Sequence, residues 1–506
     1  MSTALDAARR ARELDELTSA GTVDVLVIGG GVTGAGVALD AATRGLRTVL
    51  VESRDWAFGT SRWSSKLVHG GLRYLAAGRV GVAWESAVER GVLMTRTAPH
   101  LVRALPTVVP LFDRTPRRQQ ALIHAGFLAG DALRVAARTP AGVLPRARLV
   151  SPTQARALAP AIASAGLRGG LVAYDGQLID DARLVVGLAR TAADAGAVML
   201  TRVRAEQVTG TSARLVDTRT GATTTLAARA VINAAGVWAG DVDPSVRLRP
   251  SRGTHLVLPA AAFGNPTASI TVPIPGSLSR YVFAMPEQLG RVYVGLTDED
   301  APGPIPDEPQ ATDAEIDFLL ATVNTALGRA LTRTDVLGCY AGLRPLVDTG
   351  AGSTADLSRQ HLVSVGPTGV VSVLGGKLTT YRRMAQDAVD QAVSTAALRA
   401  GPCRTREVAL VGAAKSASTA GLPAALVARY GGESRAVVEG ATLRDPLGLI
   451  AEGMDVTRAE IEHAVTHEGA LDVADVLDRR TRIGLVPADA DRARDAVGEI
   501  VAALLG

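Results

Sequence analysis

Cysteine is nearly absent from this sequence of 506 residues, which contains only Cys339 and Cys403. Two cysteines so far apart exclude a disulfide scaffold and indicate a reducing compartment. The sequence also has no uninterrupted apolar run of about 18 residues, the length that predicts a membrane-spanning helix. Its N-terminus lacks the apolar core of a secretory signal. We therefore expect a cytoplasmic protein, with membrane contact only of the peripheral kind.

Aromatic residues are scarce as well, at 3%, and the formal net charge is only +4. Nucleic-acid-binding proteins usually carry a basic stripe interleaved with exposed aromatic side chains. This composition argues against that class, and we expect no nucleic-acid partner. Hydrophobic residues make up 47% of the chain, so a large core can form, and the length predicts two or three domains.

The clearest motif is a strand, a glycine turn and a helix within residues 24–52. Four β-formers are followed by Gly29, Gly31 and Gly34, which fit the pattern G-x-G-x-x-G. In dinucleotide sites the first glycine allows a tight turn, the second lets a pyrophosphate approach the backbone, and the third lets the helix pack closely on its strand. Glu52 ends the next predicted strand, where a ribose-binding carboxylate is expected. The motif predicts a dinucleotide site without distinguishing FAD from NAD.

Two further stretches carry groups suited to an anionic or flat ligand. Residues 57–75 combine hydroxyls, a lysine, a histidine and the pair Gly70-Gly71. Hydroxyls and backbone N–H groups suit phosphate oxygens, and a glycine pair permits close approach to a flat ring; the alternative is a polar surface loop. A strand at 370–374 leads into Gly375-Gly376-Lys377 and a helix start, which directs backbone N–H groups at a ligand.

The remaining pattern predicts an antiparallel sheet and several helices. Strand-like sequence between residues 249 and 297 indicates an antiparallel sheet inserted into the nucleotide domain. Residues 117–138 form a helix with a broad apolar face, for which we favour burial in the core over contact with a lipid interface. The other expected elements are a solvated helix at 4–20, helices at 82–103 and 314–327, a helix capped by Asp180, a hairpin around 219–221, and helical sequence after about residue 400.

Taken together, these stretches resemble the FAD-dependent glycerol-3-phosphate dehydrogenases, which belong to the glutathione-reductase-like flavoproteins with a D-amino-acid-oxidase-like substrate domain. The resemblance covers about residues 22 to 495. Besides the glycine turn, the matching motifs are Ser64-Ser65-Lys66-Leu67-Val68-His69-Gly70-Gly71-Leu72-Arg73-Tyr74, Gly253-Thr254-His255, Gly342-Leu343-Arg344-Pro345-Leu346, Gly375-Gly376-Lys377-Leu378-Thr379-Thr380, and the C-terminal stretch 464–482.

The resemblance implies an α/β fold class, with an FAD-binding Rossmann-like domain, an inserted antiparallel-sheet substrate domain and a C-terminal helical domain. The implied boundaries are 1–21 for an N-terminal extension, 22–398 for the FAD-binding domain with its interleaved substrate part (mainly 75–170 and 247–345), and 399–506 for the helical domain.

The implied reaction is oxidation of sn-glycerol 3-phosphate to dihydroxyacetone phosphate by hydride transfer to N5 of FAD, with the electrons passed to a quinone. A glycerol-3-phosphate oxidase that reduces oxygen to peroxide is the alternative, and an amine oxidase on the same fold is a more remote one. We further expect a peripheral contact with the inner face of the plasma membrane, and a homodimer is a further expectation for the assembly.

The candidate site residues combine a base, anion-binding cations and a flavin cradle. His255 is the candidate base, because an imidazole pKa near 6.5 suits proton abstraction at neutral pH. Arg344 and Lys377 are candidates for the substrate oxygens and the flavin edge. The candidates for the phosphate are Arg73, Tyr74, Arg280 and Arg359. The resemblance places FAD against Gly29, Gly31, Gly34, Glu52, Thr60, Ser61, Ser65, Lys66, Leu67, His69, Gly70, Val203, Ala235, Gly236, Gly376, Lys377, Leu378 and Thr379. A covalent link through His69 is left open.

Overall fold

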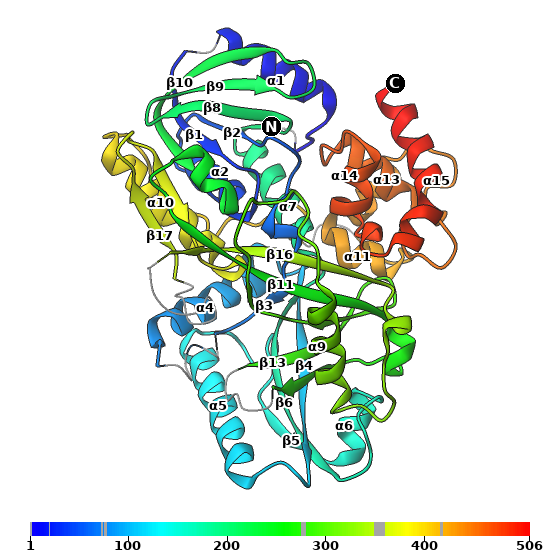
Figure 1. Ribbon diagram of the computed structural model, residues 1–506. Coiled ribbons are helices and arrows are strands. Elements are labelled where there is room, and N and C mark those ends of the chain that lie inside the picture. Colours follow the sequence, from blue (N-terminus) through cyan, green and yellow to red (C-terminus); the bar gives the residue numbers. More distant parts are fainter. Residues whose placement is uncertain are drawn as a thin grey trace.

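The computed structural model describes residues 3–19, 21–71, 74, 78–274, 280–348, 360–414 and 418–506. Two sheets form the body of the protein, and a group of helices from the end of the chain packs beside them (Figure 1). One sheet is mainly parallel and the other mainly antiparallel, which confirms the predicted fold class. The exact domain boundaries stay predictions.

The first sheet has the strand order β17-β18-β10-β1-β2-β7. Every residue of β1 except Asp24 is buried, as expected for a central parallel strand covered on both faces. A hairpin of β9 on β10 extends this sheet and confirms the turn expected around residues 219–221. The bounds are β1 Val23–Ile28, β2 Thr48–Val51, β7 Val198–Leu200, β8 Val203–Thr209, β9 Ser212–Asp217, β10 Thr223–Asn233, β17 Leu362–Val365 and β18 Val371–Leu374.

Three helices, α2 (Val32–Thr43), α7 (Asp181–Asp194) and α10 (Tyr381–Thr395), bury their apolar residues in one core with the first sheet. The side chain of Asp180 accepts a hydrogen bond from the Arg183 N–H at 3.1 Å, so the predicted N-cap of α7 is confirmed.

The N-terminal helix, α1 (Ala7–Ser19), packs into a second core formed with β1, β2 and the β8–β9 hairpin. Its Leu17 is 5% exposed, and Arg10 pairs with Asp217 at 2.8 Å. The helix expected at 4–20 is therefore present and mostly exposed, but one side of it packs on the first sheet. Arg9 pairs with Glu13 one turn along the helix, whereas the partner of Arg10 is distant in sequence and the local pattern does not show it.

The second sheet has the order β15-β11-β14-β13-β12-β4-β6-β3, with β16 on β11 and β5 on β6. Its described neighbours pair antiparallel except β12 with β4, which confirms the predicted antiparallel sheet. The bounds are β3 Leu67–Val68, β4 Val102–Phe112, β5 Arg148–Val150, β6 Leu167–Leu178, β11 Leu248–Pro259, β12 Ser269–Pro273, β13 Tyr281–Glu287, β14 Arg291–Gly295, β15 Glu299–Asp300 and β16 Gly338–Val347. Helices α6 (Pro152–Leu158) and α9 (Asp313–Asn324) cover this sheet.

Two predicted helices differ from the structure. The helix expected at 82–103 is α4 (Val80–Val92) followed by a π-helical turn, Leu93–Thr97, and the chain then enters β4 at Val102. Helix α5 (Arg117–Ala136) forms as predicted, but Leu128 is 54% and Val135 59% exposed. Burial of its broad apolar face in the core was therefore wrong. In the part of the chain that the structure describes, no helix has the length and apolarity needed to cross a membrane.

The C-terminal helices form two hydrophobic cores of their own and lie beside the first sheet, coloured orange to red in Figure 1. They are α11 Ala424–Tyr430, α12 Ser434–Glu439, α13 Arg458–Thr466, α14 Val473–Asp475 and α15 Pro487–Leu505, with a π-helical turn at Val476–Arg480. This part of the chain is helical, as the sequence indicates.

Candidate functional site

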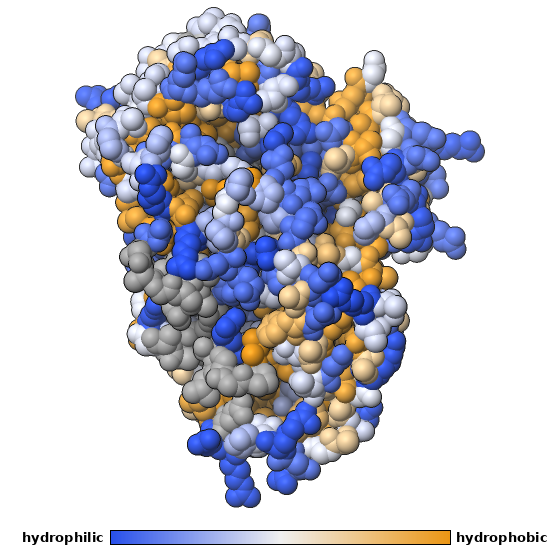
Figure 2. Space-filling model, viewed as in Figure 1, coloured by the Kyte–Doolittle hydropathy of each residue, from blue (hydrophilic) through white to orange (hydrophobic). Residues whose placement is uncertain are grey.

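One cavity of about 1420 Å³ is lined both by the glycine turn after β1 and by strands β11 and β16 of the second sheet. Those two long strands cross the middle of the molecule, where Figure 2 shows mostly hydrophilic residues on the visible face. The glycine turn and the candidates His255, Arg280, Arg344 and Lys377 therefore line a single cavity, although they are more than 200 residues apart in the sequence.

The glycine turn is built as a close-approach element. Gly29 has φ +113°, and a Cβ on Gly34 would lie 1.8 Å from the Gly29 carbonyl oxygen, so neither position accommodates a side chain. Gly31 differs because it lines the cavity, and a Cβ there would meet only the Ser61 Oγ, at 3.1 Å. The room in front of Gly31 is where a pyrophosphate could approach the start of α2.

Glu52 lines the cavity at the end of β2, as the motif predicts for a ribose-binding carboxylate. Its carboxylate accepts hydrogen bonds from the backbone N–H groups of Gly30, at 2.6 Å, and Arg54, at 2.7 Å. Burial raises the pKa of Glu52 above its ordinary value, and these two N–H groups oppose that shift. Val203, Ala235 and Gly236 also line the cavity.

Residues 59–70 follow one wall of the same cavity, and Thr60, Ser61, Ser65, Leu67, His69 and Gly70 line it. The Ser61 Oγ accepts from the Val32 N–H at 2.9 Å, and the Thr60 hydroxyl donates to the Leu343 carbonyl at 2.6 Å. These hydroxyls therefore tie the wall to α2 and β16.

Lys66 differs from the residues around it, because its side chain is buried away from the cavity. Its Nζ donates to the carboxylate of Asp181 at 3.0 Å and to the carbonyls of Arg62 and Ser64. Burial lowers the pKa of Lys66, with Asp181 opposing that shift. Contact of this ammonium group with a cofactor does not fit the structure. Arg73 and Arg359, two of the candidate phosphate ligands, lie outside the described residues.

The register of β11 against β16 places the candidate base and the candidate arginine on one face. His255 lies opposite Tyr340, and Ser251 lies opposite Arg344. Side chains an even number of residues apart on a strand point to the same face of the sheet, so His255 and Arg344 share a face. Glycines leave the room that these side chains occupy. A Cβ on Gly253 would lie 2.2 Å from Arg344 Nη2.

His255 is 2% exposed, and its ring stacks on Tyr340 with centroids 4.7 Å apart. Its Nε2 lies 2.9 Å from the Ser65 Oγ, while its Nδ1 has no hydrogen-bond partner among the described residues. Burial, together with the positive charges of Lys66 and Arg344, lowers the pKa of His255 well below 6.5. The imidazole is therefore neutral at pH 7 and able to accept a proton.

Cationic side chains surround the same space. Arg344 Nη1 contacts Asp298 at 3.1 Å, and Lys377 donates to the Ser86 hydroxyl and lies 4.2 Å from the centre of the Tyr74 ring. Arg280 is exposed and also lines the cavity. Arg344 from β16 and Lys377 from the turn after β18 thus line the same cavity.

The last segment of the wall is the turn after β18. Gly376 has φ +79°, and Gly376, Lys377, Leu378 and Thr379 all line the cavity. Sequence reasoning missed the side chains that hold the candidates in place: Tyr340, Asp298, Ser86 and Asp181. Nothing in the local sequence around them marks such roles, since each acts on a residue of a different strand or loop.

The described residues fit FAD, because the glycine turn, the carboxylate after β2 and the turn after β18 all face one cavity large enough for a dinucleotide and a small substrate. Within the described ranges, no group of three or more histidine, cysteine or acidic side chains could hold a metal ion.

Comparison with known proteins agrees with this geometry. The family model for FAD-dependent oxidoreductases matches residues 24–382, and the model for the C-terminal domain of alpha-glycerophosphate oxidase matches residues 403–506. Glycerol-3-phosphate dehydrogenase 1 from Mycobacterium bovis is 63% identical over 500 residues, covering 97% of both chains. Glycerol-3-phosphate dehydrogenase from Mycobacterium leprae is 38% identical, covering 96% of this chain and 85% of its own.

Among solved structures, the glycerol-3-phosphate dehydrogenase from Bacillus halodurans in complex with FAD is similar, with a TM-score of 0.76 and 26% identity. The match covers 99% of this chain and 94% of that chain. The glycine turn, the shared cavity and these matches lead to one assignment: the chain belongs to the FAD-dependent glycerol-3-phosphate dehydrogenase family.

Proposed function

We propose that this protein oxidises sn-glycerol 3-phosphate to dihydroxyacetone phosphate and passes the electrons to a quinone. The observation that carries the proposal is the common cavity, in which a neutral buried imidazole and several cations lie beside a dinucleotide cradle. Oxidation of a secondary alcohol needs a base for the hydroxyl proton and a hydride acceptor, and a phosphorylated substrate also needs cations.

In this proposal His255 removes the hydroxyl proton at Nε2, the ring nitrogen beside the cavity-lining Ser65. The hydrogen bond to Ser65 and the stacking on Tyr340 hold the ring in one orientation. A base fixed in this way loses little orientational freedom when the substrate binds. FAD, when bound, supplies the acceptor for the hydride that leaves the carbinol carbon.

Arg344 and Lys377 bind the substrate oxygens and stabilise negative charge that develops on the carbinol oxygen. Asp298, Ser251 and the carbonyl of Thr297 hold the Arg344 guanidinium at 3.1 to 3.3 Å, so its direction is fixed before substrate arrives. Arg280 and Tyr74 bind the phosphate group. This division of roles supports a phosphorylated alcohol over an amino acid, because several cations converge on the cavity.

A quinone is the proposed acceptor because part of the cavity wall is apolar. Leu122, Ile123 and Phe127 of α5 line it together with Leu105 and Val109 of β4. Such a wall suits the flat apolar ring of a quinone. Oxygen is the alternative acceptor, and it needs no such wall.

The exposed side of α5 supports a peripheral contact with an anionic membrane surface. Leu128 and Val135 are exposed there, and Arg117 and Arg118 are exposed at the start of the helix. Interfacial helices combine these two kinds of side chain. This contact, at the inner face of the plasma membrane, would bring the protein to a lipid-soluble acceptor; assembly as a homodimer stays a prediction.

Anaerobic mixing of the purified protein with glycerol 3-phosphate tests the proposal. We expect the flavin absorbance to bleach quickly with this substrate and much more slowly with glycerol, because binding of the remote phosphate positions the carbinol. A soluble quinone should then restore the absorbance faster than oxygen does. Equally fast bleaching by glycerol would contradict the proposed phosphate site. Bleaching by glycine in place of glycerol 3-phosphate would support an amine oxidase. Faster recovery of the absorbance with oxygen than with quinone would support the glycerol-3-phosphate oxidase.

A further inference from the structure

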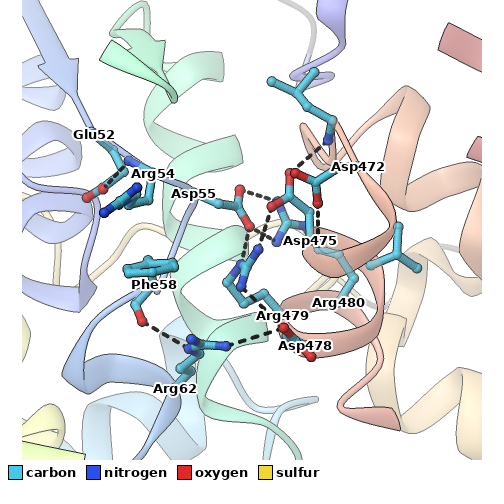
Figure 3. Close-up of polar contacts among 12 residues, drawn as sticks. Glu52, Arg54, Asp55, Phe58, Arg62, Asp472, Asp475, Asp478, Arg479 and Arg480 are labelled. Atoms are coloured by element: carbon cyan, nitrogen blue, oxygen red, sulfur yellow. Dashed lines mark hydrogen bonds and ion pairs between the residues drawn. The ribbon is translucent and has the colours of Figure 1, made fainter. Parts of the chain in front are cut away.

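The segment after β2, residues 52–63, has two faces, and we call it the cofactor loop. On one face Glu52, Arg54, Phe58, Thr60 and Ser61 line the cavity. The other face, which carries Asp55 and Arg62, is buried against the C-terminal helices (Figure 3). The described residues between 403 and 506 contribute nothing to the cavity lining. Those helices can therefore act on the cofactor only indirectly, and the loop is a direct physical link between the two.

Asp55 is the centre of this contact. Its carboxylate accepts hydrogen bonds from Arg479 Nε at 2.6 Å and from both terminal nitrogens of Arg480 at 2.8 Å. The three side chains are at most 4% exposed. Burial alone would raise the pKa of Asp55, but the two guanidinium groups lower it below its ordinary value. The carboxylate is thus charged, and it neutralises buried positive charge from the C-terminal helices.

A second contact lies further along the loop, at Arg62. Its Nε donates to the Phe58 carbonyl at 2.9 Å, and its own carbonyl accepts from Arg482 Nη2 at 2.6 Å. The guanidinium of Arg62 also lies over the rings of Phe58, at 5.1 Å, and Trp63, at 4.0 Å. Phe58 and Trp63 both line the cavity. The C-terminal chain therefore fixes the backbone that presents two aromatic rings to the ligand.

We infer that the C-terminal arginine cluster (Arg479, Arg480 and Arg482) positions the cofactor loop for FAD and so sets the affinity of the protein for this cofactor. The inference rests on the proposed FAD site. A loop that is already held in its binding conformation loses less conformational entropy when the ligand binds. The coupling is reciprocal, so bound FAD should also stabilise the docking of the cluster.

Asp55→Asn tests the cluster with little change of shape. We expect the dissociation constant for FAD, measured by quenching of flavin fluorescence on deflavinated protein, to rise by about tenfold or more, the usual size of coupling between linked sites. Arg480→Met should act in the same direction. Arg480→Lys retains the charge but loses the bidentate contact, and should recover part of the affinity.

A matched control separates this effect from general loss of stability. Arg429 is equally buried in the same helical part and pairs with Glu460 at 2.6 Å, without an observed contact to the cofactor loop among the described residues. Arg429→Met should leave the FAD affinity within about twofold, as expected for a distant site. A loss as large as that of Asp55→Asn, or unchanged affinity in folded Asp55→Asn, would overturn the inference.

Hydrogen exchange of the unaltered protein gives a second test that needs no variant to fold. Added FAD should slow amide exchange in residues 476–482, because the linkage is reciprocal. Unchanged exchange in that segment, with FAD bound, would contradict the inference. Failure of the unaltered protein to bind FAD at all would instead refute the cofactor site itself, and the inference with it.

Discussion

Replacing His255 by glutamine should slow reduction of the flavin by glycerol 3-phosphate at saturating substrate. Glutamine can still hydrogen-bond to the Ser65 hydroxyl, which lies 2.9 Å from His255 Nε2, but its amide accepts no proton near neutral pH. The variant therefore removes the base while retaining a polar contact in the same wall.

The expected loss follows from the worth of a general base. Such a group typically contributes about 10²- to 10⁴-fold to the rate, which corresponds to about 3 to 5 kcal/mol in the activation free energy. The change should appear in the limiting reductive rate and not only in KM, because the proton is transferred in the transition state.

The pH dependence of the unaltered enzyme adds a second expectation. Sequence alone predicts that the rate rises as an imidazole with a pKa near 6.5 loses its proton. Burial, with Lys66 and Arg344 nearby, places the pKa of His255 well below 6.5, so the rate should already be constant from about pH 6.5 upward. The same shift affects stability. The unfolded chain binds a proton that the folded chain does not, so the contribution of His255 to stability falls as the pH drops below 6.5.

Stopped-flow absorbance under anaerobic conditions is the assay, with FAD content measured for each variant. Tyr340→Phe is the control, since it retains a ring for stacking and loses only the hydroxyl that donates to the Ser64 carbonyl at 3.2 Å. Reduction of His255→Gln within about threefold of the unaltered rate, far below the worth of a general base, would refute the reasoning. His255 would then be structural, and Lys377 would be the next candidate.

Two further predictions concern the cofactor turn and α5. Gly31→Val should fold but lose FAD, whereas Gly34→Ala should also destabilise the fold, because its Cβ would lie 1.8 Å from the Gly29 carbonyl oxygen. Thermal unfolding and flavin content distinguish the two variants. Normal flavin content in folded Gly31→Val would contradict the assignment of the cofactor turn. The double variant Leu128→Glu, Val135→Glu should sediment less with anionic vesicles than the unaltered protein. Leu449→Glu changes an equally exposed leucine in the C-terminal part and should sediment normally. Equal sedimentation of the unaltered protein and both variants would exclude α5 as the membrane contact.

Features with a local cause could be predicted from the sequence. The glycine turn, the Asp180 cap and the hairpin after β9 depend on residues within a few positions of each other, and each forms as expected. The antiparallel sheet was also predictable, because alternation of apolar and polar residues indicates strands with one buried face.

Features set by distant partners could not be predicted. Lys66 lies in a motif rich in ligand-binding groups, yet Asp181 draws its ammonium group away from the cavity. The apolar pattern of α5 is the same whether the helix is buried or exposed. Whether Leu128 is buried depends on which distant elements pack against α5, and in the structure this side chain is exposed. For His255 the sequence indicated the residue type, while the neutral state comes from burial beside Lys66 and Arg344.

The glycines of β11 and β14 bear on how this site can diverge. Gly253 leaves the space taken by the Arg344 guanidinium, and Gly295 leaves the space taken by the His255 ring, 2.3 Å from where its Cβ would lie. Each functional side chain is therefore sterically paired with a glycine on a neighbouring strand. A mutational path that alters the arginine or the histidine can enlarge its glycine afterwards, but the reverse order is blocked. Substitutions at these four positions should thus occur in a fixed order, with the arginine or histidine changing before its glycine. In the same way, an engineered variant for a bulkier substrate gains room when Arg344 is shortened first.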